Sequence, residues 1–394
     1  MKELLQQRFD IRKLIGEGIY SKVYEVLDLV NGNPCALKIF LDNTALLQNE
    51  ECALRFLREI EVMKGVSNSY TVGIVDDGLN DGTSLWYTME LMEGSIRDLL
   101  LADKLDTDIL RYAVSVQCLL CVESVHMEGI IHRDIKPENF LFKYAPGHEL
   151  PYICVSDFGH CRPASARSTL TRTGIGSELY ASPESMYLAR NVTVRSDVYS
   201  LGKVIYEIFT GVPLGALYDG GFDKKSPNWL FPLCSEAANN NPALRHESVF
   251  DFALDFLFYL FGDIRNQRDI QKIIDIALRV TGEMCLADIL ASNRDNPLNI
   301  LDILATCAFP FIKDDGLLKI YSGHISKIFL KIDETTMKGF LKIYAQSIVN
   351  GNFRYVEIDR DSFIEKSRRL KSFAFYALEK FLFPQGVSDP HAIK

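Results

Sequence analysis

No apolar run in this chain approaches the roughly 20 residues that a membrane-spanning helix requires. The nearest stretch, residues 250–264, is interrupted by aspartates and indicates a buried helix instead. The opening residues, MKELLQQRFDIRK, also lack the apolar segment of a signal peptide. We therefore expect a cytoplasmic protein without a transmembrane segment.

Positive charge is scarce as well. The 43 Lys and Arg residues are outnumbered by 52 Asp and Glu residues, which gives a formal net charge of −9. This balance argues against a global basic field for nucleic acid or anionic membranes, although it leaves room for a local patch. Nucleic acid is not an expected partner.

The chain lacks an even, regularly spaced set of cysteines. Its nine cysteines are odd in number and irregular in spacing, which argues against a disulfide framework and for reduced, buried thiols. Cys118 and Cys121 form a CxxC pair, but a zinc or redox site needs further ligands or a strand-to-helix turn. We expect both thiols to be core residues.

What the chain does contain is the composition of a packed globular protein, with 47% apolar and 24% charged residues over a length that suits two domains. Residues 9 to about 90 form short alternating runs, which predict a small antiparallel sheet, and a helical pattern at 44–64 interrupts them. Later residues are mostly helical in pattern. We predict an α+β fold with three regions: 1–92, 93–310 and 311–394.

Two local features of the predicted sheet suggest chemistry. Gly16 and Gly18 lie between strands, where a glycine turn lets backbone N–H groups approach a phosphate, although a hairpin without a ligand is the commoner outcome. Lys38 lies inside an apolar strand and is costly to bury without a partner, which Glu59 on the next helix could supply. A structural ion pair and a functional one remain equally open at this point.

Two further segments are rich in polar chemistry. Residues 132–139, HRDIKPEN, place a carboxylate, a cation and an amide in one loop after a predicted buried helix. That combination can orient a hydroxyl, neutralise a phosphate and bind a metal. Asp157, in the triplet Asp157-Phe158-Gly159, follows an apolar run, and a carboxylate at a strand end suits Mg²⁺.

Together, these motifs resemble the eukaryotic-like serine/threonine protein kinase family. The glycine loop, the strand lysine, the HRDIKPEN loop, the Asp-Phe-Gly triplet and a closing Ser-Pro-Glu segment occur in the family's order. The resemblance covers about residues 9 to 212. It implies the bilobal protein-kinase fold, with a small antiparallel β lobe carrying one long helix and a large helical lobe. Residues 311–394 would add extra C-terminal helices.

The resemblance assigns ATP binding to the first lobe and to the segment between the lobes. The glycine loop would cover the ATP phosphates, and two apolar side chains and the interlobe backbone would hold the adenine. Met89 would guard the back pocket. The residues with these ATP-binding roles would be Gly16, Gly18, Val23, Ala36, Glu90 and Met92.

It also assigns the catalytic roles. Lys38 would contact the α- and β-phosphates and pair with Glu59. Asp134 would accept or orient the proton of the acceptor hydroxyl. Lys136 would steady the γ-phosphate, and its position two residues after Asp134 is the serine/threonine-type pattern. Protein Ser or Thr is therefore the expected acceptor.

Other matching residues would hold the metal and the backbone. Asn139 and Asp157 would bind Mg²⁺ as the cofactor, with ATP as the co-substrate. Asp197 would anchor the backbone of the loop at 132–139. Glu184 would meet an arginine of the large lobe, and the candidates considered are Arg265, Arg268, Arg279 and Arg294.

Regulation through the activation segment is a further expectation. Arg133 would receive a phosphate from this segment, which contains several hydroxyls, and pairing would order it. A constitutively ordered loop is the alternative. The candidate phosphorylation sites are Ser168, Thr169, Thr171 and Thr173.

Several alternatives stay open. A pseudokinase scaffold or signalling binding module is the main one, and a small-molecule kinase of related fold is another. Residues 213–248 read as an irregular insertion that binds substrate or is merely a loop. The basic amphipathic stretch 366–383 is expected to pack on the protein, with autoinhibition or docking of a partner as the alternatives.

Overall fold

The computed structural model describes residues 7–18, 20–41, 49–66, 68–78, 85–146, 148–163, 179–187, 191–215 and 227–249, with a few further positions between 251 and 276. The chain divides into two compact units. One comprises residues 1–106 and 117–245, and the other comprises 107–116 and 246–394. The site described below lies within the first unit.

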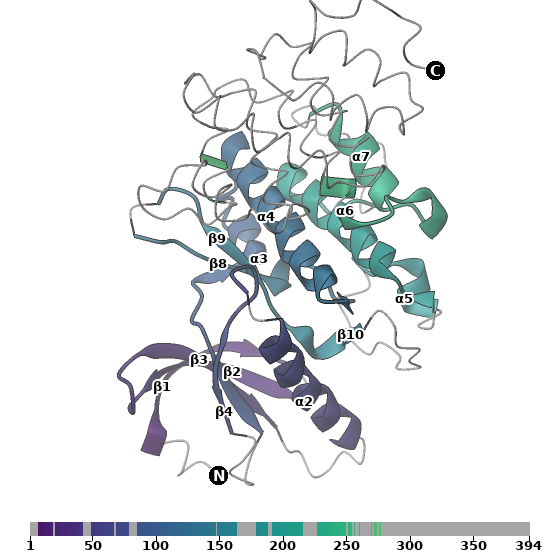
Figure 1. Cartoon of the computed structure of the whole chain (residues 1–394). Helices are drawn as coiled ribbons and strands as arrows, with labels where there is room; N and C mark the ends of the chain where they lie inside the picture. Colours follow the sequence, from purple (N-terminus) through teal and green to yellow (C-terminus); the bar gives the residue numbers. More distant parts are fainter. Residues whose placement is uncertain are drawn as a thin grey trace, which may run out of the picture. The chain divides into compact units, whose positions relative to one another are not determined.

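The N-terminal part of the first unit is a five-stranded antiparallel sheet in the order β1-β2-β3-β5-β4 (Figure 1). One long helix, α2 (Asn49–Gly65), follows β3. The strands are β1 (Phe9–Glu17), β2 (Ser21–Asp28), β3 (Pro34–Phe40), β4 (Ile74–Asp77) and β5 (Trp86–Met89). The predicted small sheet with one long helix is therefore confirmed.

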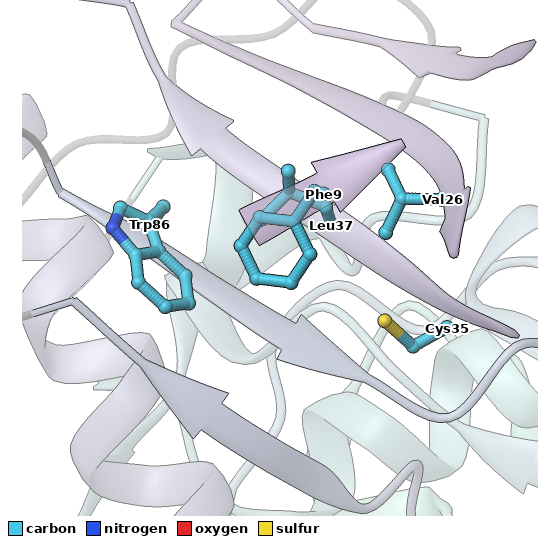
Figure 2. Close-up of a cluster of buried hydrophobic side chains, with 5 residues drawn as sticks. All are labelled: Phe9, Val26, Cys35, Leu37 and Trp86. Carbon is cyan, nitrogen blue, oxygen red and sulfur yellow. The ribbon is translucent and has the colours of Figure 1, made fainter. Parts of the chain in front are cut away.

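A cluster of buried side chains holds four of these strands together (Figure 2). Phe9 and Trp86 meet edge to face with ring centroids 5.3 Å apart, a favourable geometry for aromatic pairs. The Arg8 guanidinium lies 4.9 and 5.2 Å from their centroids, and its Nη2 is 3.2 Å from Asp28 and 2.6 Å from Asp76. The result is a rigid support for β3, the strand that carries Lys38. The other members of the cluster are Val26, Cys35 and Leu37.

The rest of the described chain is dominated by helices, as predicted. The helices are α3 (Ile96–Leu101), α4 (Asp108–Met127), α5 (Pro183–Tyr187), α6 (Val194–Thr210) and α7 (Leu230–Ala237). Short strands accompany them: β6 (Gly94–Ser95), β7 (Ile130–Ile131), β8 (Phe140–Lys143), β9 (Tyr152–Val155) and β10 (Arg162–Pro163). Short 3₁₀ turns that the structure describes from end to end are η1 (Pro137–Asn139), η2 (Phe158–His160) and η4 (Pro242–Leu244). The α+β class is confirmed.

Helix α4 is the one described helix whose length and composition alone would suit a membrane span, yet 67% of its most apolar window is buried in the protein. Cys118 and Cys121 lie on it and are both fully buried. The Cys121 thiol donates a hydrogen bond to the Ile153 carbonyl. Both thiols are therefore core residues, as predicted.

Helix α6 has well-defined ends. Thr193 caps its start, with the side-chain oxygen accepting from the Arg195 N–H, and Gly211 ends it at φ 71°. A left-handed residue after the last turn strongly favours glycine. Close packing on α7 requires a second glycine, since a Cβ built on Gly202 would lie 2.8 Å from the Ala237 Cβ.

The prediction of an irregular insertion at 213–248 is wrong in part. The described residues of this stretch include α7, whose Leu230, Leu233 and Cys234 are buried, and the η4 turn. The many Gly and Asn residues around α7 conceal an eight-residue helix that packs on α6.

Several sequence-based expectations lie outside the described residues. They include the start of the helix predicted at 44–64, most of the stretch 250–264 and the amphipathic tail. The division into regions 1–92, 93–310 and 311–394 stays a prediction.

Candidate active site

Lys38 and Glu59 form the first part of the site. Lys38 pairs in register with Val23 on β2 and Tyr87 on β5, which places it at the centre of the sheet. Its Nζ lies 2.7 and 2.9 Å from the two carboxylate oxygens of Glu59 on α2. The Tyr87 hydroxyl donates to the same carboxylate at 2.9 Å. The predicted pair is therefore formed, with a third partner that sequence reasoning missed.

Burial and charge act in opposite directions on Lys38. Burial alone would lower its pKa, but the carboxylate of Glu59 raises it, Tyr87 and Asp157 act in the same direction, and the net pKa lies well above normal. The side chain therefore stays cationic at neutral pH. Its Nζ is 3.8 Å from Asp157 Oδ1, so one ammonium group faces two carboxylates.

The loop after α4 gathers two polar side chains, Lys136 and Asn139, around Asp134, which is buried. Lys136 Nζ lies 2.7 Å from Asp134 Oδ2. The Asn139 amide donates to the Asp134 carbonyl at 2.7 Å and to its carboxylate at 3.1 Å. The structure thus brings together the predicted carboxylate, cation and amide, and Asn139 fixes both the backbone and the side chain of Asp134.

Asp197, at the start of α6, anchors this loop as predicted. Its carboxylate accepts hydrogen bonds from the backbone N–H groups of His132 and Arg133, both at 2.8 Å. Arg133 has φ 70°, a conformation that costs energy for any residue with a side chain. His126 Nε2 lies 2.8 Å from the same carboxylate and was not assigned a role from the sequence. The anchor holds a strained backbone directly beside Asp134.

Asp157 lies at a second strained position, with φ 64°. The next residue, Phe158, is fully buried and packs against the His132 ring at 5.2 Å, while His132 Nε2 bonds the Ser156 carbonyl at 3.1 Å. This packing fixes the backbone on both sides of Asp157. Its carboxylate is 39% exposed, unlike the buried Asp134, and can therefore reach a ligand.

Asn139 and Asp157 are the residues that fit a divalent cation. Because the Asn139 amide nitrogen is engaged by Asp134, its amide oxygen is the atom available to a metal. No group of three or more His, Cys, Asp or Glu side chains forms a metal cage within the described part of the chain. Mg²⁺ does not require one, since it is commonly bound by one or two protein oxygens together with substrate phosphates.

The residues predicted to contact adenine and the phosphates lie in the sheet of the N-terminal part. Gly16 pairs with Val23 across β1 and β2, and the Gly18 N–H donates to the Ser21 carbonyl at 2.8 Å, which closes a tight turn. Ala36 is buried and pairs with Met89 on β5. These positions are compatible with the assigned roles, which stay predictions.

The segment after β5 leads away from the sheet. The Glu90 N–H donates to the Gly73 carbonyl at 3.0 Å, and its carboxylate forms an ion pair with Lys143 on β8. The Glu90 backbone can therefore offer a ligand its carbonyl rather than its N–H. Met92 is half-buried two residues further along.

The partner of Glu184 is Arg245, and the four candidates considered from the sequence are wrong. Arg245 Nη1 and Nη2 lie 2.6 and 2.9 Å from the two oxygens of Glu184. Ser196 donates to the same carboxylate at 2.7 Å. Arg245 directly follows the η4 turn. Because this stretch was expected to be an irregular insertion, the sequence analysis did not consider Arg245 as the partner of Glu184.

A four-residue network next to the loop was also missed. Arg97, on α3, donates to Glu138 at 2.8 Å, to Glu207 on α6 at 2.7 Å and to the Tyr180 hydroxyl at 2.6 Å. The Tyr180 hydroxyl in turn donates to Glu207. These residues lie far apart in the chain and share no local pattern, so only the fold brings them together. The predicted phosphorylation sites, Ser168, Thr169, Thr171 and Thr173, lie outside the described residues.

Comparison with known proteins matches this arrangement to one family. The family model described as the protein kinase domain matches residues 9–229. Among curated relatives, the serine/threonine-protein kinase PknL of Mycobacterium tuberculosis is 34% identical over 211 residues, which cover 53% of this chain and 50% of PknL.

Two other relatives give the same picture. A probable serine/threonine-protein kinase of Clostridium perfringens is 32% identical over 266 residues, covering 63% of this chain and 37% of that protein. The probable serine/threonine-protein kinase PknB of Corynebacterium glutamicum is 31% identical over 220 residues, covering 54% and 33%. The chain spans half or less of the length of these relatives.

Proposed function

The chain belongs to the protein kinase family, and from that premise we propose that it transfers the γ-phosphoryl group of ATP to Ser or Thr side chains of a protein. The observation that carries this proposal is the cluster of Lys136 and Asn139 around Asp134, within the same unit as the Lys38–Glu59 pair. The names of the relatives support the choice of a Ser or Thr acceptor.

Asp134 would orient the acceptor hydroxyl and accept its proton. Its carboxylate is buried and held by Asn139, so little reorganisation is needed when a substrate binds. Lys136 lies 2.7 Å from the same carboxylate and would stabilise negative charge on the transferred phosphoryl group. Both groups act by position and charge, which is what phosphoryl transfer requires.

Lys38 would bind the α- and β-phosphates as a cation that Glu59 keeps in place. The amide oxygen of Asn139 and the carboxylate of Asp157 would hold Mg²⁺, which would supply positive charge to neutralise the phosphates. The glycine turn, Val23, Ala36, the Glu90 carbonyl and the Met92 backbone would bind the remainder of ATP.

Regulation belongs to the same proposal. A phosphate on Ser168, Thr169, Thr171 or Thr173 would pair with Arg133, whose backbone is anchored beside Asp134. A charge-assisted contact there would order the activation segment next to the catalytic carboxylate. Residues 311–394 would modulate the kinase through autoinhibition or by docking a partner.

A cytoplasmic setting is supported by the seven described cysteines, which form no disulfide with one another.

The experiment is transfer of radiolabelled γ-phosphate from Mg·ATP to myelin basic protein, followed by mapping of the labelled residues. The wild type is compared with Asp134→Asn and with the matched control Glu128→Gln, which changes an exposed carboxyl directly after α4. We expect label on Ser and Thr that falls at least ~100-fold in Asp134→Asn and is unchanged in the control. A wild type that binds ATP but transfers no phosphate would support the pseudokinase alternative.

A further inference from the structure

Tyr87 connects β5 to α2 in two ways. Successive side chains of a strand point to opposite faces of the sheet, so Trp86 joins the cluster around Phe9 whereas Tyr87 faces α2. The Tyr87 ring lies 5.4 Å from the ring of Phe56, and its hydroxyl donates to Glu59 Oε1 at 2.9 Å. Phe56 and Glu59 are three residues apart and therefore lie on one face of α2. Tyr87 holds this face of the helix both by packing and by a hydrogen bond.

The Tyr87 hydroxyl shares its acceptor with Lys38. The Lys38 Nζ lies 2.7 Å from Glu59 Oε1, the atom that Tyr87 also contacts, and 2.9 Å from Glu59 Oε2. Glu59 is 2% exposed, and a carboxylate buried to that extent requires hydrogen-bond donors. Two donors of different kinds therefore hold this carboxylate: a charged ammonium group and a neutral hydroxyl.

The Tyr87 hydroxyl keeps its proton and remains a donor. Burial raises the pKa of Tyr87 well above its usual value, and the neighbouring Glu59 carboxylate acts in the same direction. A phenylalanine would also pack against Phe56 and would avoid the cost of burying a hydroxyl. What the tyrosine adds is a donor for Glu59 that carries no charge.

The absence of charge matters once phosphates approach Lys38. Its ammonium group already faces Glu59 and, at 3.8 Å, Asp157 Oδ1. ATP phosphates would bring further negative charge to the same nitrogen, which has three protons to donate, so these new contacts compete with those to Glu59. The Tyr87 hydroxyl carries no charge for the phosphates to attract, and its ring is packed on Phe56. Glu59 therefore keeps one fixed donor when Lys38 turns to a ligand.

We propose that Tyr87 is a positioning residue for the nucleotide, which keeps the Glu59 carboxylate in place while Lys38 binds the ATP phosphates. The inference rests on the proposed function, because it takes Lys38 to be the residue that contacts those phosphates. Tyr87 is buried and acts through Glu59. Its removal should therefore weaken binding of the phosphates and leave binding of the nucleoside intact.

The test is equilibrium binding to the full chain, measured by isothermal titration calorimetry with Mg·ATP and with adenosine, which has no phosphates. Tyr87→Phe removes the hydroxyl and keeps the ring. The matched control is Tyr24→Phe on β2, since Tyr24 packs against the cluster around Phe9. We expect Tyr87→Phe to raise the Kd for Mg·ATP about fivefold, the loss typical of one hydrogen bond, and to leave the Kd for adenosine within about twofold. Tyr24→Phe should change neither Kd.

A purely structural role predicts a different pattern. If Tyr87 does no more than support the sheet and α2, Tyr87→Phe weakens binding of Mg·ATP and of adenosine by the same factor, and that result overturns the inference. An unchanged Kd for Mg·ATP overturns it as well. In the transfer assay, the KM for ATP should rise by a similar factor while the kcat at saturating ATP stays within about twofold. A lower kcat at an unchanged KM for ATP contradicts the assigned role.

Glu59→Ala tests whether Tyr87 acts through Glu59. In this background, Tyr87→Phe should change the Kd for Mg·ATP by less than about twofold, because no carboxylate is left for the hydroxyl to hold. A further loss as large as that in the wild-type background overturns the inference.

The binding measurements also separate this inference from the proposed function. A wild type that binds Mg·ATP but transfers no phosphate contradicts the proposed function, whereas a selective effect of Tyr87→Phe on Mg·ATP binding would still support the inference. A wild type that does not bind Mg·ATP overturns both.

Discussion

Arg245 and Glu184 form a two-pronged ion pair, with Nη1–Oε1 and Nη2–Oε2 distances of 2.6 and 2.9 Å. The Arg245 side chain is fully buried, and its guanidinium lies 4.8 Å from the centre of the Tyr199 ring. The Lys203 Nζ lies 5.0 Å from the centre of the same ring. The pair therefore joins α5 to the residue that follows η4, and the guanidinium packs on Tyr199 of α6.

Removal of the arginine is expected to destabilise the protein strongly. Arg245→Met leaves the Glu184 carboxylate buried without its cation, and such a loss typically costs about 3–5 kcal/mol. Urea unfolding at neutral pH measures it, and the double variant Glu184→Gln with Arg245→Met should recover part of the loss. Arg245→Met with wild-type stability would contradict the assignment of the pair.

The same pair predicts a dependence of stability on pH. Burial alone would raise the pKa of Glu184, but hydrogen bonds from Arg245 and Ser196 outweigh it and lower the pKa below its usual value near 4.5. A carboxyl with a lowered folded pKa stabilises the protein above its unfolded pKa, and this contribution is lost as the pH falls through the folded pKa. Glu184→Gln should therefore show a smaller difference in unfolding free energy between pH 7 and pH 3 than wild type. Glu128→Gln, which is exposed, should keep the wild-type difference.

Tyr87 offers a milder test of the Lys38–Glu59 pair. Tyr87→Phe removes the 2.9 Å hydrogen bond to Glu59 but keeps the ring packing against Phe56, whose centroid is 5.4 Å away. Because Lys38 still holds Glu59, we expect a loss of about 0.5–1.5 kcal/mol in stability and a rise of a few-fold in the KM for ATP. Lys38→Met should instead reduce transfer by orders of magnitude at unchanged fold, as judged by circular dichroism. A loss of phosphate transfer in Tyr87→Phe as large as that in Lys38→Met would contradict this prediction.

Metal dependence follows from the positions of Asn139 and Asp157. Chelation with EDTA should abolish transfer, and added Mg²⁺ should restore it. Asp157→Asn removes the more exposed of the two site carboxylates and should raise the Mg²⁺ concentration for half-maximal transfer at least tenfold. A Mg²⁺ titration of Asp157→Asn that coincides with wild type would show that the cation is held elsewhere.

The regulatory proposal predicts that Arg133 and the activation-segment hydroxyls act through one contact. Replacing Ser168, Thr169, Thr171 and Thr173 with alanine should lower the activity, and Arg133→Gln should lower it to a similar level. Combining the two changes should add little, because they remove the same charged pair. Activity is measured as kcat/KM for myelin basic protein. Additive losses would show that Arg133 and these hydroxyls do not act through one contact.

The parts of the site that could be predicted are those encoded by neighbouring residues. The group around Asp134 occurs within eight residues, and the anchoring role of Asp197 was implied by the resemblance to the kinase family. The sequence analysis missed the network of Arg97, Tyr180 and Glu207. Arg97 lies on α3, Tyr180 lies just before α5 and Glu207 lies on α6, and only the fold brings these three positions together. Arg245 was missed for a related reason. The Asn-rich residues before Arg245 looked irregular in the sequence. They form a compact turn in which Arg245 donates to the Asn239 carbonyl at 2.6 Å.

Helix α6 holds both the loop at 132–139 and residues 179–180. Asp197 near its start holds the backbone beside Asp134, whereas Lys203 and Glu207 hold residues 179–180. These attachments span about 15 Å of one continuous hydrogen-bonded rod. Close packing at Gly202 leaves that rod little freedom to slide or rotate against α7. Thermal displacement of α6 would therefore carry both attached segments together and preserve the distance between Asp134 and residues 179–180.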